Sequence, residues 1–368
     1  MNNKTNQAVS NSDGQQATLG TELVRILKLG LDMHYRQVTV AMQEGEGRIK
    51  IAGKMSHEEF EAWVGKKLAE GWQIKSTYEA GASGYWLHRE LGQKGVENLV
   101  VVPKAMGKGG KRQKTDRRDS VALVDALDRY LRGREDALSV VSVPSIEQEE
   151  NRALIRRHRR IMTDRGRNEA RGKGLLCAQG IEIRGTWWQW QEWEKLQSHP
   201  RLREWMKEQL EDLRKEILAA EEQQQALRKR IEALAPAMAL PKGMGAYSAA
   251  VLEYEMKGWE RFKNRRQVAS YTGLCPGVHL SDEKGKEGAI NHCGNPTVSW
   301  TLVEMVWRLK KWQPLYGPVR QLAAGLAKSK RARKRLVVMA ARRLAIDLWR
   351  IRTGQCSGAK LGLIMCSR

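Results

Sequence analysis

The first third of the chain alternates short apolar runs with longer segments that have a helical repeat. Short runs rich in Val, Ile and Leu and bounded by glycine predict strands, and segments with a helical repeat predict helices. Ser56-His57-Glu58-Glu59 resembles a capping box and predicts a helix start. The expected strands are 25–32, 37–42, 48–52, 72–78 and 98–102, and the expected helices are 56–70, 84–95 and 120–131.

These elements occur in the order of a ribonuclease H-like domain, so we expect an α/β domain over residues 23–144. Asp32 ends the first strand and Glu79 ends the fourth, while Asp116 and Asp119 begin the last helix. The ends of neighbouring strands converge, and two residues three apart in a helix point to nearly the same side. Carboxylates gathered in this way would make an all-oxygen site suited to Mg²⁺.

Each of these acids also has a simpler interpretation. The two helix acids could only favour the dipole at the helix start. Asp32 could be a turn residue, and Glu79 could be a surface acid before a glycine-rich loop. Their joint placement favours the metal site. Asp128 falls on the opposite side of the same helix and is expected to be solvated.

Residues 145–238 are predicted to form long helices. The segment 145–178 is strongly basic, which suits a track for a nucleic-acid backbone. The tryptophans between 187 and 193 are expected to form a small apolar core joining two helices, although they could instead stack on bases. From Met206 to Leu234, apolar residues recur at alternating steps of four and three. This seam predicts a coiled coil, either between protomers or against the preceding basic helix.

The rest of the chain is predicted to form a helical domain and two tails. Residues 239–352 have helical patterns, interrupted by a loop over 278–295 that carries Ser281. Residues 1–22 are polar and are expected to be a disordered tail. Residues 353–368 are expected to be a loose tail.

Composition makes nucleic acid the expected partner. The 368-residue chain has a formal net charge of +23 and a pI near 10.0, and phosphate is the simplest partner for such an excess. No apolar stretch reaches the ~20 residues of a membrane span, and the polar start shows no signal peptide. Five scattered cysteines without a Cys-x-x-Cys pair support neither disulfides nor zinc, so a reducing, cytoplasmic setting is expected. The expected phosphate contacts are Lys111, Arg112, Lys114, Arg117, Arg118, Arg156, Arg160, Lys328, Lys330, Arg331, Arg333, Lys334 and Arg335.

Two parts of the sequence resemble a known family. The N-terminal motifs are LGLD, TYEAGASGYWLHREL and VVVPKAMGKGGKRQKTDRRDSVAL, which hold the four acids. The C-terminal motif is FKNRRQVASYTGLCPGVHLSDEKGKEGAINHCGNPTVSWTLVEMVW. These motifs resemble the insertion-sequence transposases of the 110 family, more specifically its 1111 group, which are recombinases guided by a bridge (or seeker) RNA. The likeness runs from about residue 27 to residue 352.

The resemblance implies a RuvC-like domain, a coiled coil and a transposase domain with a nucleophilic serine. Its Asp-Glu-Asp-Asp set falls on Asp32, Glu79, Asp116 and Asp119, and its serine falls on Ser281. It also implies a phosphoserine link to DNA, strand exchange without water, and assistance by Mg²⁺. The implied partners are DNA, a structured guide RNA and further copies of the chain in a dimer or tetramer. The implied location is prokaryotic cytoplasm, at the nucleoid.

Two rival interpretations are weighed against the recombinase. A metal-dependent nuclease or junction resolvase of the same class would need the acids but not Ser281, and would leave hydrolysed ends. A protein that only binds RNA or DNA would tolerate loss of Asp116 and Asp119. The helical domain, which a plain resolvase does not require, favours the recombinase. Relatives often carry a basic residue where His292 and Cys293 stand. Because no histidine pairs obviously with the serine, a metal is expected to activate its hydroxyl.

Overall fold

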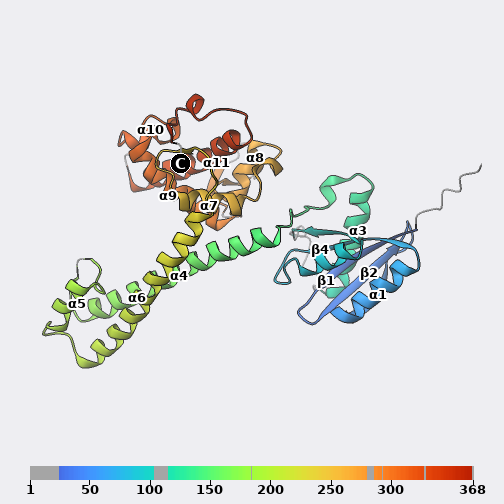
Figure 1. Ribbon diagram of the computed structural model, residues 1–368, viewed down its shortest axis with the longest axis horizontal. Helices are drawn as coiled ribbons and strands as arrows, with labels where there is room; N and C mark the ends of the chain where they lie inside the picture. The colour runs from blue at the N-terminus through green and yellow to red at the C-terminus, as the bar shows by residue number, and fades with distance from the viewer. Residues whose placement is uncertain are drawn as a thin grey trace, which may run out of the picture. The chain divides into compact units, whose positions relative to one another are not determined.

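The computed structural model describes residues 25–102, 115–183, 185–279, 286–291, 293–326 and 329–366 (Figure 1). The chain divides into two compact units, residues 1–143 and 144–368, and each unit has apolar clusters of its own. Within the described ranges, no helix combines the length and apolar character needed to cross a membrane.

The N-terminal unit is a five-stranded mixed sheet with helices on both faces. The strand order is β3-β2-β1-β4-β5, in which β2 runs antiparallel to β1 and β3, whereas β1, β4 and β5 are parallel. The predicted order of elements is confirmed, and the mixed α/β unit is consistent with a RuvC-like domain. The elements are β1 (Arg25–Met33), β2 (Gln37–Glu44), β3 (Lys50–Ser56), α1 (His57–Ala69), β4 (Trp72–Glu79), α2 (Trp86–Gln93), β5 (Glu97–Val101), α3 (Asp116–Leu131) and the 3₁₀ turn η1 (Glu135–Ala137).

Different helices cover the two faces of this sheet. Leu29 and Leu31 of β1 point to one face, where α1 contributes Phe60 and α2 contributes Leu87 to a buried core. Side chains alternate along a strand, so Gly30 points to the opposite face, against which α3 packs. The capping box predicted at the start of α1 is confirmed, since Ser56 and Glu59 bond reciprocally to each other's backbone amides.

The expectation that Asp128 is solvated is wrong. Its side chain is only 14% exposed and forms ion pairs with Lys28 of β1 and with Arg132. The Lys28 ammonium lies on the sheet face beneath α3 and also donates to the carbonyl of Gly45. A buried ammonium requires a compensating charge, and the carboxylate of α3 supplies it.

Two long helices packed side by side begin the C-terminal unit (Figure 1). These are α4 (Ile146–Ala178) and α6 (Glu204–Ala233), and the short α5 (Trp190–Gln197) lies between them in sequence. The α6 residues of the predicted heptad seam are buried or half-buried. The basic helix is therefore a packing partner of the seam within one chain, which is one of the two arrangements that the seam predicted.

The tryptophan segment forms the small apolar core that was predicted. Trp187, Trp188 and Trp193 are buried together with residues of α4 and α6, whereas Trp190 is 64% exposed. Gly172 of α4 makes room for this core, because a Cβ there would lie 2.1 Å from the Trp187 ring.

The remainder of the C-terminal unit is mostly helical, but it is not the all-α domain that was expected. Two small sheets, β6 with β9 and β7 with β8, interrupt the helices. Part of the predicted loop over 278–295 is thus a hairpin, since Val278 and His279 pair with residues of β8. The elements are β6 (Leu240–Pro241), α7 (Ala246–Met256), η2 (Trp259–Arg261), α8 (Arg265–Tyr271), β7 (Pro276–His279), β8 (Lys286–Ile290), α9 (Pro296–Trp312), α10 (Gly317–Ala323), α11 (Lys330–Arg352), η3 (Ala359–Leu361) and β9 (Met365–Cys366).

The described part of the segment 353–368 is packed rather than loose. Leu363 is buried in the core of the helical unit, and Cys366 pairs with Leu240. Gln313 donates to the carbonyl of Ile364 at 2.8 Å and accepts from its amide at 3.0 Å. The apolar residues of this stretch are therefore packed and hydrogen-bonded against the helical unit.

Candidate metal and nucleic-acid site

The strand register brings two of the predicted acids to one edge of the sheet. Leu31 of β1 pairs with Tyr78 of the parallel strand β4, so the next residues, Asp32 and Glu79, are neighbours across strands about 4.8 Å apart. Both acids line one cleft of about 730 Å³ together with His34. The carboxyl ends of two central strands therefore place these side chains as the sequence predicted.

A glycine allows α3 to approach the same edge. A Cβ on Gly30 would lie 2.2 Å from the Ser120 carbonyl oxygen and 2.7 Å from the Val124 nitrogen. Such distances exclude any side chain unless the helix moves away. The glycine of the LGLD motif thus permits close contact between β1 and α3, and Asp32 stands two residues beyond it on the same face.

At the start of α3, Asp116 lies beside Asp32. The imidazole Nε2 of His34 is 3.4 Å from Asp32 Oδ2 and 3.2 Å from Asp116 Oδ2. Lys54 of β3 donates to Asp116 Oδ2 at 3.3 Å. This hydrogen bond lowers the pKa of Asp116 below its ordinary value, and the charge of His34 acts in the same direction. Asp116 is therefore held as a carboxylate.

The donor atoms fit a divalent cation. One atom each from Asp32, His34 and Asp116 lie within 4.8 Å of one another. Two carboxylates are ligands for hard cations such as Mg²⁺ or Mn²⁺, whereas an imidazole nitrogen is typical of transition metals. These three donor atoms are therefore two oxygens and one nitrogen, whereas an all-oxygen site was predicted. Sequence reasoning missed His34, although its position two residues after Asp32 was a usable signal.

The other two predicted acids stand near this group but outside it. Glu79 lines the same cleft as Asp32. Asp119 is half-buried one turn along α3 from Asp116, on the side of the helix that carries the buried Ser120 and Leu123. All four acids therefore belong to the N-terminal unit and to elements that meet at the carboxyl end of β1.

Most predicted phosphate contacts within the described ranges are exposed. Arg117, Arg118 and Arg160 are exposed, and so are five cations in the first turns of α11: Lys330, Arg331, Arg333, Lys334 and Arg335. Cations at a helix start are opposed by the helix dipole, although the Arg333 guanidinium lies 4.9 Å from the centroid of the Trp307 ring of α9. Ser281, His292, Lys111, Arg112, Lys114 and Lys328 lie outside the described residues.

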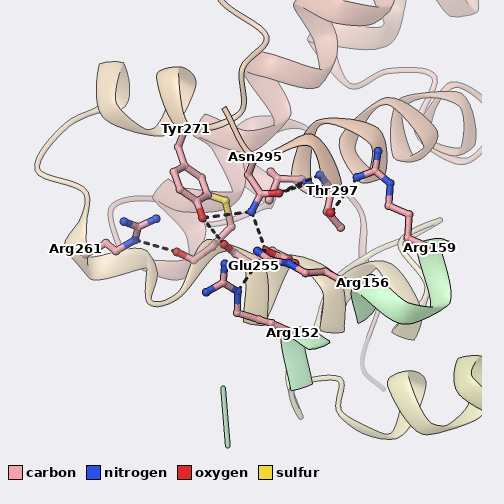
Figure 2. Close-up of polar contacts among 10 residues, drawn as sticks. Arg152, Arg156, Arg159, Glu255, Arg261, Tyr271, Asn295 and Thr297 are labelled. Atoms are coloured by element: carbon pink, nitrogen blue, oxygen red, sulfur yellow. Dashed lines mark hydrogen bonds and ion pairs between the residues drawn. The ribbon is translucent and has the colours of Figure 1, made fainter. Parts of the chain in front are cut away.

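Arg156 differs from these contacts because it is committed to a carboxylate. Its Nε and Nη2 donate to the two oxygens of Glu255 at 3.0 and 3.2 Å, and Arg152 lies 3.4 Å from the same group. Glu255 is fully buried in α7. Burial alone would raise its pKa, but hydrogen bonds from Arg156 and Asn295 and the arginine charges outweigh burial and lower it. Figure 2 shows these side chains converging.

Glu255 also holds the two ends of the segment that contains Ser281, which we call the serine segment (residues 272–294). Asn295, the N-cap of α9, donates to Glu255 Oε2 at 2.8 Å, and the Tyr271 hydroxyl donates to the Glu255 carbonyl at 2.6 Å (Figure 2). Between these two residues, a Cβ on Gly294 would lie 2.1 Å from the Gly273 nitrogen. The ends of the serine segment are therefore tied together and to α7. Sequence reasoning missed Glu255, although an acid inside the apolar helix 246–256 is unusual.

Fold and site together are consistent with a transposase of the DEDD, RuvC-like class. Residues 29–178 match a family model for DEDD transposases of the IS110 group, described as "Transposase". Residues 238–317 match a second model, described as "Transposase IS116/IS110/IS902 family". Both parts of the chain are therefore similar to IS110 family transposases.

Curated relatives bear transposase names as well. The y4rJ protein of Sinorhizobium fredii is 33% identical over 266 residues, which are 64% of this chain and 65% of that protein. The chain thus spans just under two thirds of that relative. The transposase for insertion sequence element IS1533 of Leptospira borgpetersenii is 24% identical over 266 residues, 68% of this chain and 75% of that protein.

Proposed function

We propose that this protein is the transposase of a mobile insertion sequence and that it cuts and rejoins DNA strands. The observation that carries the proposal is the approach of Asp32 and Asp116 at one edge of a RuvC-like sheet, in a chain whose two units both match transposase family models. The net charge of +23 supports a nucleic-acid partner.

Asp32, Glu79, Asp116 and Asp119 would hold divalent metal, of which Mg²⁺ is our choice. When bound, the metal supplies charge that polarises phosphoryl oxygens. The chain's own residues prepare the site. Lys54 keeps Asp116 ionised, and the His34 imidazole lies between the carboxylates of Asp32 and Asp116. Exposed cations such as Arg117 at the start of α3 would hold the DNA backbone next to this edge.

Ser281 is the proposed nucleophile. Its Oγ attacks a backbone phosphorus and loses its proton, a serine–phosphate bond forms, and a sugar oxygen leaves as a hydroxyl. A hydroxyl of a second strand then attacks the phosphoserine, forms the new diester and releases the serine. The number of phosphodiester bonds is conserved, so neither water nor nucleotide is consumed.

Three further proposals come from the family resemblance. A structured guide RNA selects donor and target by base pairing, while the protein binds backbone and shape. The chain self-associates as a dimer or tetramer, with a coiled coil built on the α4–α6 helices. The protein acts in the prokaryotic cytoplasm at the nucleoid.

Product analysis separates this function from its rivals. Labelled DNA carrying element ends, with guide RNA and Mg²⁺, is incubated with wild type, Ser281→Ala, Asp116→Asn and the matched control Ser270→Ala, which changes an exposed serine of α8. We expect joined strands only from wild type and the control. Hydrolysed ends from Ser281→Ala would establish a nuclease or resolvase instead. No strand product from any protein, together with DNA binding that Asp116→Asn leaves unchanged, would leave only nucleic-acid binding.

A further inference from the structure

The cleft that contains Asp32 and Glu79 is also lined by aromatic rings. Its volume is about 730 Å³, and Tyr35, His57 and Trp86 line it together with the two acids. Pockets for small ligands span about 300–1,000 Å³, so the cleft has more room than a metal ion requires. Carboxylates and flat rings in one cleft suit a phosphate held through metal and a flat group attached to that phosphate.

His57 connects the elements that carry these rings. Its ring lies edge-on to that of Trp86 in α2, with centroids 5.0 Å apart and planes at 87°. Its Nε2 donates to the Tyr35 carbonyl oxygen at 3.3 Å, in the turn between β1 and β2. The segment 81–83, which follows β4, contributes only small residues to the lining. The His57 and Trp86 rings are therefore held by contacts among α1, α2 and this turn, and the cleft stays open beside them.

Tyr35 presents its ring to solvent at the edge of the cleft. The residue is 93% exposed, so its ring buries little apolar surface and folding gains little from it. Arg36, the next residue, is exposed as well. Proteins bind unpaired bases with an exposed aromatic ring beside a cation, because the ring stacks on the base and the cation contacts the backbone. The turn between β1 and β2 therefore has the side chains of a base-binding surface.

We propose that this cleft binds an unpaired base of the DNA strand, next to the phosphate that Asp32 and Glu79 hold through metal, with Tyr35 and Trp86 as the stacking surfaces. The choice of DNA rests on the proposed function. A base is joined to its phosphate through one sugar, so a phosphate at the acids brings the neighbouring base to the rings. A base inside a duplex is covered by its neighbours, so the cleft takes one that has left the stack. Its binding would hold the phosphate in position at the acids.

Base binding is measured without strand chemistry, in the full-length Ser281→Ala chain with Mg²⁺. The probe is a DNA duplex with one bulged 2-aminopurine, whose fluorescence falls when the base stacks on an aromatic ring. A fully paired DNA duplex and an RNA duplex with the same bulge are measured beside it. The variants are Tyr35→Ala, Tyr35→Phe and Trp86→Leu. The matched control is Trp190→Ala, which removes a 64% exposed ring from the C-terminal unit.

We expect the parent to bind bulged DNA more tightly than paired DNA and to quench the 2-aminopurine. Tyr35→Ala should reduce the quenching and weaken binding of the bulged duplex about five-fold, with binding of the paired duplex unchanged. Because Tyr35 is exposed, this variant should melt at the same temperature as its parent. Tyr35→Phe, which keeps the ring, and the Trp190→Ala control should both behave as the parent does.

Quenching that neither Tyr35→Ala nor Trp86→Leu reduces would overturn the base site. An equal loss of affinity for bulged and paired DNA would also overturn it, because the contact would then be to the backbone. Quenching of the RNA probe but not of the DNA probe would overturn the choice of DNA. Strand joining is scored separately in the Ser281-containing chain. Joining without quenching would refute the base site alone, and quenching without joining would refute the transposase proposal alone.

Discussion

Gly30 is the position at which the acidic site depends most directly on packing. Replacing it with alanine puts a Cβ 2.2 Å from the Ser120 carbonyl oxygen, where ordinary contact begins at 3.4 Å. The helix α3 must then move by about 1.2 Å, because the nearest atoms belong to its backbone and no flexible side chain can yield. Overpacking of this kind costs about 1–3 kcal/mol, and a backbone clash belongs at the upper end.

The movement also displaces Asp116 from Asp32. A misplacement of about 1 Å at a reacting group can lower activity about 100-fold, so we expect Gly30→Ala to fold with reduced stability and to lose most strand joining. Urea unfolding measures the first effect, hydrogen exchange of the α3 amides locates it, and the joining assay measures the second.

Gly65→Ala is the matched control for this substitution. Gly65 lies inside α1 with no atom within 4 Å of an added Cβ, so alanine should stabilise the chain by about 0.5–1 kcal/mol and leave joining unchanged. If Gly30→Ala retained wild-type stability and full activity, the close contact between β1 and α3 would not be what positions the acids.

Three further predictions concern charge and packing elsewhere. Asp128→Ala leaves the Lys28 ammonium buried without its carboxylate, so it should lower the free energy of unfolding in urea by about 3 kcal/mol. Asp125→Ala, which breaks an exposed ion pair, should lower it by under about 0.5 kcal/mol. Equal losses of stability in the two variants would contradict the burial argument. Gly294→Ala pushes the two ends of the serine segment apart, so it should abolish strand joining while DNA binding persists. Gly317→Ala is the control and should leave joining unchanged, because no atom lies within 4 Å of its added Cβ. Full joining by Gly294→Ala would show that the close contact between Gly294 and Gly273 is not needed. Lys257 has a pKa lowered from 10.5 to about 8, so between these values the unfolded chain binds more protons, and stability should rise with pH by about 1–2 kcal/mol after allowance for exposure. Urea unfolding at two pH values should show this rise in wild type and not in Lys257→Asn, and a rise in both would assign it to another group.

Periodicity revealed most of the fold because each element faces a core. The strands and helices of residues 25–131 follow apolar patterns that burial explains, and the apolar seam of α6 is buried or half-buried against its neighbours. The pattern could not reveal which charges lie under a helix. Asp128 was expected in solvent because a helical projection contains no information about Lys28 on the sheet below it.

Residues of the site differ in how much sequence could say about them. Asp32, Glu79 and Asp116 lie at element ends, which the strand order brings together. His34 and Lys54 contact Asp116 through tertiary proximity. The position of His34 two residues after Asp32 was a local signal for one of these contacts, whereas local pattern carries no signal for Lys54. Glu255 was hidden for a similar reason, since its arginine partners lie about a hundred positions earlier in the chain.

We propose that the acids of the N-terminal unit and Ser281 act in one reaction. The most direct measurement is the protein–DNA adduct on a denaturing gel, with labelled DNA and with or without Mg²⁺, for wild type, Ser281→Ala and Asp116→Asn. We expect a covalent adduct only from wild type with metal. An adduct formed by Ser281→Ala, or one formed equally well by Asp116→Asn, would contradict it.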